Sequence, residues 1–185
     1  FEMYLWSNGA AFVDDEGKMD GNINSKKSAE AFQMFQDMEK EGIAYAAEKG
    51  VSSEFLGGNT AMYVDGTWPM GSLDEAGVNY GIVQIPKFKG QEVSRSVINT
   101  CGIAISKDTE NKEAAWEFVK FWTGEEMNKY RINTELPALK SVVESEGLEE
   151  NEKYAPFYKA LENCTGYVPA SFIVDDWSEV DSDVA

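Results

Sequence analysis

Short apolar runs, most of them next to a glycine or a proline, alternate along this chain with segments whose apolar residues recur at helical spacing. The short runs are residues 60–65, 80–85, 96–99 and 102–106. Each has the length of a short strand. Helices that alternate with short strands are typical of the α/β class. The pattern therefore predicts an α/β fold with a small mixed sheet flanked by helices.

Helical periodicity is clearest in residues 113–123, which end at Gly124. Its apolar residues at positions i, i+3, i+4 and i+7 are Ala115, Phe118, Val119 and Trp122. We expect this helix, with Trp116 and Trp122, to face the core. A second helix is predicted from the cap at Asn24-Ser25 to Glu41, before Gly42. Shorter helices are predicted at residues 52–56, after Pro69, and at residues 125–132, 141–147 and 152–163.

The chain is strongly acidic and has no histidine. Its 33 Asp and Glu against 16 Lys and Arg give a net charge of −17. This balance argues against binding nucleic acid or an anionic membrane surface, because both need clustered basic residues. Without histidine there is no Ser-His-Asp triad and no His-ligated metal site. With 185 residues, enough to bury a core, we expect one domain or one lobe of a larger protein, without a metal or another cofactor.

Paired carboxylates raise the possibility of an enzyme, because glycoside hydrolases act with two acids. The candidate groups are Asp14-Asp15-Glu16, Glu149-Glu150 and Asp175-Asp176. Each lies in a polar run, where a solvated surface is the usual explanation. Residues 14–20 also lack the alternating acids and the twelfth-position glutamate of a calcium loop. We expect no catalytic residue here, with a carbohydrate-active hydrolase as the alternative.

Three tryptophans lie outside the periodic segments. Trp68 follows an apolar run and Gly66 at a turn, Trp177 lies among acids, and Trp6 precedes Ser7-Asn8-Gly9. Sugar rings have flat C–H faces that pack on aromatic rings, and acids and amides bind their hydroxyls. Indoles beside carboxylates and an asparagine therefore favour carbohydrate binding. A structural role for each indole is the alternative.

Motifs along nearly the whole chain follow one another in the order of a known family. They are residues 6–9 (WSNG) with Phe12, 24–32, 55–62 (FLGGNTAM), 66–68 (GTW), 80–86 (YGIVQIP), 102–107 (GIAISK), 111–118 (NKEAAWEF) and 136–141 (LPALKS). This order resembles the extracellular solute-binding proteins of carbohydrate ABC importers, the maltose-binding-protein-like group. The most specific stretches are residues 102–107 and 111–118.

The resemblance implies two α/β lobes that close on a ligand, of which this chain is similar to the second, C-terminal lobe. Residues 1–169 would form the ligand-binding lobe and residues 170–185 an acidic tail near the hinge, with the first lobe absent from this chain. The implied function is that of a non-enzymatic receptor for a sugar or oligosaccharide. A receptor for another polar solute, such as a peptide or polyamine, is the alternative on the same fold, and a protein-interaction module is a third possibility.

The partners that the resemblance implies are the sugar, an ABC permease in the membrane and the missing N-terminal lobe. The implied location is extracytoplasmic, as a surface lipoprotein or in the periplasm.

The resemblance also suggests which residues bind the ligand. They are Trp68, Trp177, Asn99, Thr100, Cys101, Trp6 and Asn8. Trp68 matches the Gly-x-Trp aromatic that stacks on sugar, and Trp177 is similar to a second aromatic of the cleft. Residues 99–101 match a strand end that faces the ligand, although many relatives carry glycine there.

Two further expectations concern the cysteines and the tail. Cys101 and Cys164 are far apart in sequence, and we expect no structural disulfide between them. The tail from residue 170 contains acids but neither Lys nor Arg. Because like charges repel, we expect this tail to be poorly held by its own lobe.

Overall fold

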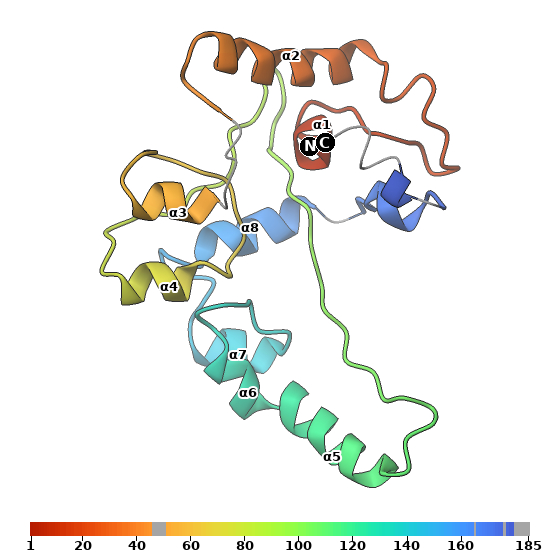
Figure 1. Cartoon of the computed structure of the whole chain (residues 1–185), viewed down its shortest axis with the longest axis vertical. Helices are drawn as coiled ribbons and strands as arrows, with labels where there is room; N and C mark the ends of the chain where they lie inside the picture. The colour runs from red at the N-terminus through yellow and green to blue at the C-terminus, as the bar shows by residue number, and fades with distance from the viewer. Residues whose placement is uncertain (46–50, 165, 176, 180–185) are drawn as a thin grey trace. The chain divides into compact units, whose positions relative to one another are not determined.

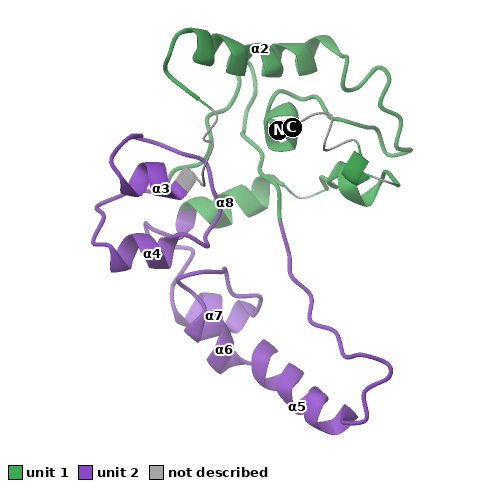
Figure 2. Ribbon diagram, viewed as in Figure 1, with its two compact units in different colours: residues 1–46, 83–98, 156–185 green, residues 47–82, 99–155 purple. Residues whose placement is uncertain are grey.

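The computed structural model describes residues 1–45, 51–164, 166–175 and 177–179 (Figure 1). Its helices, in chain order, are α1 (Glu2–Ser7), α2 (Lys26–Lys40), α3 (Val51–Leu56), α4 (Met70–Glu75), α5 (Lys112–Thr123), α6 (Glu125–Tyr130), α7 (Lys140–Ser145), α8 (Ala155–Asn163) and the short 3₁₀ helix η1 (Ala170–Phe172). The chain divides into two compact units (Figure 2). Unit 1 comprises residues 1–46, 83–98 and 156–185, and unit 2 comprises residues 47–82 and 99–155.

The predicted helices are confirmed, because local signals determine where they begin and end. At the start of α2, the Ser25 hydroxyl accepts a hydrogen bond from the backbone N–H of Ser28 at 3.2 Å. This bond satisfies one of the free N–H groups of the first turn. Beyond α2, Gly42 has a φ of +69°, a conformation that residues with a Cβ rarely adopt. Helix α1 was not predicted from the sequence.

The prediction of an α/β fold with a small mixed sheet is wrong for the described residues. The four apolar runs all lie in the described part of the chain, and no strand occurs there. They form irregular segments in which Met62 and Val83 are 84% and 83% exposed. Composition indicates only that a segment suits a pleated, half-buried surface. A strand also needs a neighbour that pairs with its backbone N–H and C=O groups, and that partner cannot be read from the segment itself.

Unit 1 is organised around α1. Leu5 of this helix is fully buried, and the core around it contains Phe12, Val13, Ala31 and Ala170. Helix α1 packs on α2. The Tyr4 ring meets the Phe35 ring edge-on, with centroids 4.7 Å apart. The first helix of the chain therefore covers part of the apolar face of the second.

The described part of the acidic tail packs on this same core. Ala170 is fully buried, and Ile173, Val174 and Trp177 pack against the core residues. The backbone N–H of Ala170 also donates to a carboxylate oxygen of Glu2 at 2.7 Å. The expectation of a poorly held tail is therefore wrong for residues 170–175 and 177–179. These contacts come from the apolar side chains of the tail, whose burial is favourable.

Unit 2 contains α3 to α7, in which α5 contacts α6 and α6 contacts α7. Its buried apolar residues are Met70, Leu73, Val142, Val143, Leu148 and Tyr154. The buried amide of Asn128 donates to the carbonyl oxygens of Thr123 and Gly124 at 3.0 and 2.9 Å, and it accepts from the N–H of Ala138 at 2.9 Å. Asn128 thus fixes the corner between α5 and α6.

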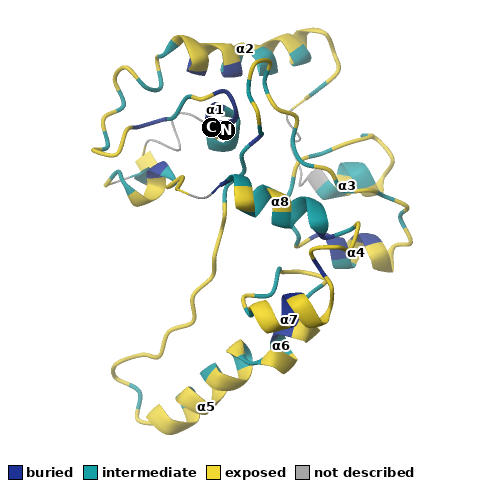
Figure 3. Ribbon diagram, turned by 180° about the vertical axis from the view of Figure 1, so that it is seen from behind, coloured by how far each residue is buried: buried dark blue, intermediate teal, exposed yellow. Residues whose placement is uncertain are grey.

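Helix α5 was expected to face the core, but it does not. None of its residues is buried, and Trp116 is 54% exposed (Figure 3). The predicted core included a sheet flanked by helices, and the described residues form no sheet. The aromatic residues contact one another instead, and the Phe118 and Trp122 rings stack with centroids 5.8 Å apart.

Two further facts bear on the sequence expectations. Cys101 is exposed, Cys164 is buried, and both are free thiols. Among the helices that the described residues form, none combines the length and apolarity needed to cross a bilayer.

Replacement of Leu5 by alanine should destabilise unit 1, because Leu5 is fully buried at the centre of its core. We expect Leu5→Ala to lower the free energy of unfolding by about 2–5 kcal/mol, measured by urea denaturation. Phe172→Ala is the matched control, since Phe172 lies in η1 beside the core and is mostly exposed. Equal losses for the two variants would contradict the assignment of Leu5 to the core.

Candidate functional site

The turn that carries Trp68 is anchored by buried neighbours. Trp68 lies between the irregular segment at residues 60–65 and α4, and Pro69 is the N-cap of that helix. Pro69 and Met70 are buried, whereas Trp68 is 59% exposed. The proline ring also restricts the backbone of the residue before it. The backbone is therefore held at the point where the indole faces outward.

Gly66 makes room for the indole. A Cβ atom at this position would overlap Cζ3, Cε3 and Cη2, three atoms of the six-membered ring of Trp68. Part of the indole therefore lies directly against the backbone of Gly66, and the rest stays accessible. An aromatic group backed in this way is restricted on one side without being buried. This is what a surface for stacking a ligand requires.

Hydrogen bonds hold the turn on both sides of Trp68. The hydroxyl of Thr67 donates to the carbonyl oxygen of Thr134 at 2.8 Å. The backbone N–H of Gly66 donates to the Asp65 carboxylate at 2.9 Å, and the N–H of Met70 donates to the carbonyl of Thr67 at 3.1 Å. Thr67, which precedes Trp68, is thus hydrogen-bonded to the segment of unit 2 that contains Thr134.

A charged cluster in the same unit includes Asp74 of α4. The Lys153 ammonium lies 2.5 Å from the Asp74 carboxylate, and the Tyr80 hydroxyl donates to the other oxygen of Asp74 at 3.0 Å. The bond from Lys153 holds the pKa of Asp74 below its ordinary value. Burial disfavours the charge on Lys153, but the bonds to Asp74 and Tyr80 outweigh it and raise the pKa of Lys153. Sequence reasoning missed this cluster, because no local pattern connects residues 74 and 153.

The other predicted site residues of unit 2 are exposed. Asn99, Thr100 and Cys101 follow one another in an irregular segment. No hydrogen bond between described residues connects them to Trp68. Their amide, hydroxyl and thiol groups are accessible, and they lie on the surface of the same unit as Trp68.

The predicted site residues of unit 1 are engaged within that unit. Trp6 is buried, and its ring centroid lies 5.2 Å from that of Tyr167. Asn8 is also buried, and its amide donates to the carbonyl of Lys27 at 2.8 Å. Trp177 is half-buried and meets the Phe12 ring edge-on, with centroids 5.5 Å apart. Of the three predicted indoles, Trp68 is the one that is mostly exposed.

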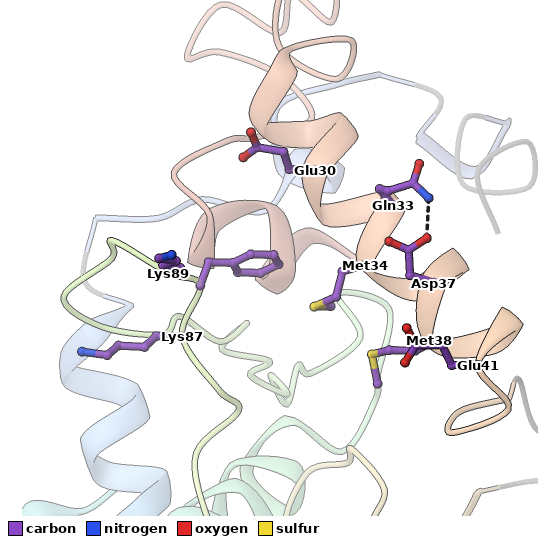
Figure 4. Close-up of a pocket in the computed structure, with 9 residues that line it drawn as sticks. Glu30, Gln33, Met34, Asp37, Met38, Glu41, Lys87 and Lys89 are labelled. Atoms are coloured by element: carbon purple, nitrogen blue, oxygen red, sulfur yellow. Dashed lines mark hydrogen bonds between the residues drawn. The ribbon is translucent and has the colours of Figure 1, made fainter.

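Unit 1 has an open groove that sequence reasoning did not find. Its volume is about 580 Å³, and it lies between α2 and the loop at residues 87–89 (Figure 4). The groove is lined by Glu30, Gln33, Met34, Asp37, Met38, Glu41, Lys87, Phe88 and Lys89. In the sequence, the groove is indicated only by the helical spacing of the acids Glu30, Asp37 and Glu41 along α2. Charges of both signs line it, so its charge favours no single class of ligand.

The candidate carboxylates other than Asp176, which lies outside the described residues, belong to turns or to the exposed surface. Asp14 accepts hydrogen bonds from the backbone N–H groups of Glu16 and Lys18 at 3.1 and 2.9 Å, which is the chemistry of a turn. Glu149, Glu150 and Asp175 are exposed. No group of three or more acids or cysteines that could hold a metal ion occurs among the residues that the structure describes.

Comparison with known proteins places the chain in a family. The family model for bacterial extracellular solute-binding proteins matches residues 1–156. The chain is 28% identical to a galactooligosaccharide-binding protein of Bacillus subtilis over 141 residues, which cover 72% of this chain and 34% of that protein. It is 30% identical to a maltooligosaccharide ABC transporter solute-binding lipoprotein of Streptococcus pneumoniae over 90 residues, 48% of this chain and 21% of that protein.

A solved structure has a similar fold. The maltose-maltodextrin binding protein of Alicyclobacillus acidocaldarius aligns with a TM-score of 0.68 and 20% sequence identity. The alignment covers 87% of this chain and 46% of that one, so the chain spans less than half the length of the proteins it resembles. Because the family model matches most of the chain, the resemblance expected from the sequence motifs is confirmed, and this chain belongs to the family of bacterial extracellular solute-binding proteins.

Proposed function

We propose that this chain supplies part of the ligand-binding site of a sugar or oligosaccharide receptor that serves an ABC importer, and that Trp68 is its principal stacking surface. The observation that carries the proposal is the exposed indole of Trp68, which is held by buried neighbours and backed by Gly66. The family supports a binding protein, and the names of the related proteins support a sugar as the ligand.

Stacking of a sugar on Trp68 is physically reasonable for two reasons. The ring presents a flat apolar face, which suits the C–H face of a sugar. Its position is set before the ligand arrives, so little side-chain freedom remains to be lost on binding. Asn99 and Thr100 carry the amide and hydroxyl groups that bind sugar hydroxyls, and both are exposed.

The residues of unit 1 take a less direct part in this proposal. Trp6, Asn8 and Trp177 pack or hydrogen-bond within unit 1, so we assign direct ligand contact first to the residues of unit 2. Cys101, exposed beside Thr100, belongs to the same proposed surface as Asn99.

The proposal includes partners that lie outside this chain. The chain covers 46% of the solved homologous chain. We infer that residues 1–169 correspond to the C-terminal lobe, that residues 170–185 lead toward the hinge, and that a separate lobe completes the cleft. A membrane permease would receive the sugar from the closed receptor. The family is extracellular, which agrees with the expected location outside the cytoplasm, at the cell surface or in the periplasm.

Removal of the indole should weaken sugar binding without destabilising the protein. In the full-length receptor, we expect Trp68→Ala to reduce the affinity for maltooligosaccharides or galactooligosaccharides by about 2 kcal/mol, or about 30-fold, in calorimetric titration. Trp116→Ala is the control, because Trp116 is 54% exposed in the same unit. An unchanged affinity together with a lower ligand-free melting temperature would place Trp68 in the core instead.

The titration also decides between classes of ligand. Sugar binding that depends on Trp68 supports the proposal. Binding of a peptide or a polyamine, with no sugar bound, would assign the receptor to one of the alternatives. Cleavage of the oligosaccharide during the titration would indicate a hydrolase.

A methyl group at Gly66 should displace the indole while leaving the tryptophan in place. We expect Gly66→Ala to weaken sugar binding by roughly 1 kcal/mol or more, since the added Cβ occupies space that the Trp68 ring now fills. Gly81→Ala is the matched control, because a Cβ there has no neighbour within 4 Å. If both variants bound sugar like the unmodified receptor, the backing role of Gly66 would be excluded.

A further inference from the structure

Two consecutive residues, Lys153 and Tyr154, hold the two ends of the turn that carries Trp68. Lys153 forms its 2.5 Å ion pair with Asp74 of α4, the helix that begins directly after Pro69. Its ammonium also lies 5.2 Å from the ring centroid of Tyr80, whose hydroxyl donates to Asp74. The segment at residues 153–154 therefore fixes the helix on the C-terminal side of the turn.

The second connection reaches the N-terminal side of the turn. Tyr154 is buried, and its hydroxyl donates to the side-chain oxygen of Asn133 at 3.1 Å. The next residue, Thr134, accepts the hydrogen bond from Thr67 at 2.8 Å. The turn at residues 131–135 thus connects Tyr154 to the residue that immediately precedes Trp68.

The same turn also lies against α4. A Cβ atom at Gly71 would be 3.7 Å from the carbonyl oxygen of Asn133 and from the Thr134 methyl group. Both ends of the Trp68 turn, Thr67 and α4, therefore contact residues that are themselves held by Lys153 or Tyr154. All of these residues belong to unit 2.

The ion pair is suited to orientation more than to overall stability. The side chains of Lys153 and Asp74 are 30% and 40% exposed, and exposed pairs contribute little to the free energy of unfolding. The pair is nevertheless held by a third partner, Tyr80, which restricts its geometry. Because Asp74 has a lowered pKa and Lys153 a raised one, both stay charged throughout the neutral pH range.

We propose that Lys153 and Tyr154 are positioning residues for ligand binding, which set the orientation of the Trp68 indole through α4 on one side and through Asn133, Thr134 and Thr67 on the other. The inference rests on the proposed function only in that Trp68 is the sugar-stacking surface. The effect of Lys153 and Tyr154 on the orientation of the Trp68 indole is a separate claim. It can be tested without a ligand.

The test uses the full-length receptor labelled with 5-fluorotryptophan. Trp68→Phe identifies the ¹⁹F NMR signal of Trp68, and calorimetry measures maltooligosaccharide affinity. The test variants are Lys153→Met, which keeps the apolar stem without the charge, and Tyr154→Phe, which removes only the hydroxyl. Lys129→Met is the matched control, since Lys129 forms an ion pair with Glu125 at 2.9 Å in the same unit.

We expect Lys153→Met and Tyr154→Phe each to move or broaden the Trp68 signal and to weaken sugar binding about three- to ten-fold, which is the range for one lost hydrogen bond. Lys153→Arg should restore most of both properties, because arginine can still pair with Asp74. Lys129→Met should change neither. A structural role without positioning would lower the melting temperature and leave the ligand-free Trp68 signal unmoved.

The possible results separate the inference from the proposed function. If the Trp68 signal moves in both variants but Trp68→Ala binds sugar normally, the positioning of the indole stands and its role in sugar binding fails. If Trp68→Ala weakens binding but the Trp68 signal and the affinity are unchanged in Lys153→Met and Tyr154→Phe, the positioning inference is overturned and the sugar site stands.

Discussion

An indole that rests on the backbone of Gly66 and is still mostly exposed is the feature on which this account depends. Trp68 projects from a turn whose next two residues are buried, and its ring rests on a glycine that has no side chain to push it away. An exposed aromatic ring without such support would lose freedom when a ligand binds. A fully buried one could not contact a ligand. The Trp68 turn satisfies both requirements, as a stacking surface must.

Helices could be predicted from the sequence because their signals are local. The Ser25 cap and the glycine after α2 act within a few residues of the helix ends, and the structure uses both. The sheet could not be predicted correctly, since apolar composition in residues 60–65 or 102–106 does not reveal a pairing partner. Whether α5 is covered and where the tail packs also depend on segments that are distant in the sequence. The local sequence of α5 or of the tail does not identify those segments.

The candidate site was predictable only in part. Trp68 could be selected because a turn after glycine, and before proline, commonly displays its side chain. Nothing in the sequence showed that Gly66 is required as space for the ring, or that Lys153 and Asp74 would meet across 79 positions. The burial of Trp6 and Asn8 depends on Tyr167 and Lys27, which are likewise outside their local sequence. The chain spans less than half of the related solved chain.

The most direct test is a crystal structure of the full-length receptor with a bound maltooligosaccharide. The account predicts a sugar ring lying on the exposed face of Trp68, with carbon atoms within about 4.5 Å of the indole. It also predicts that the other part of the indole remains against Gly66. A bound sugar with no atom near Trp68, or an indole covered by protein in the complex, would contradict the central claim.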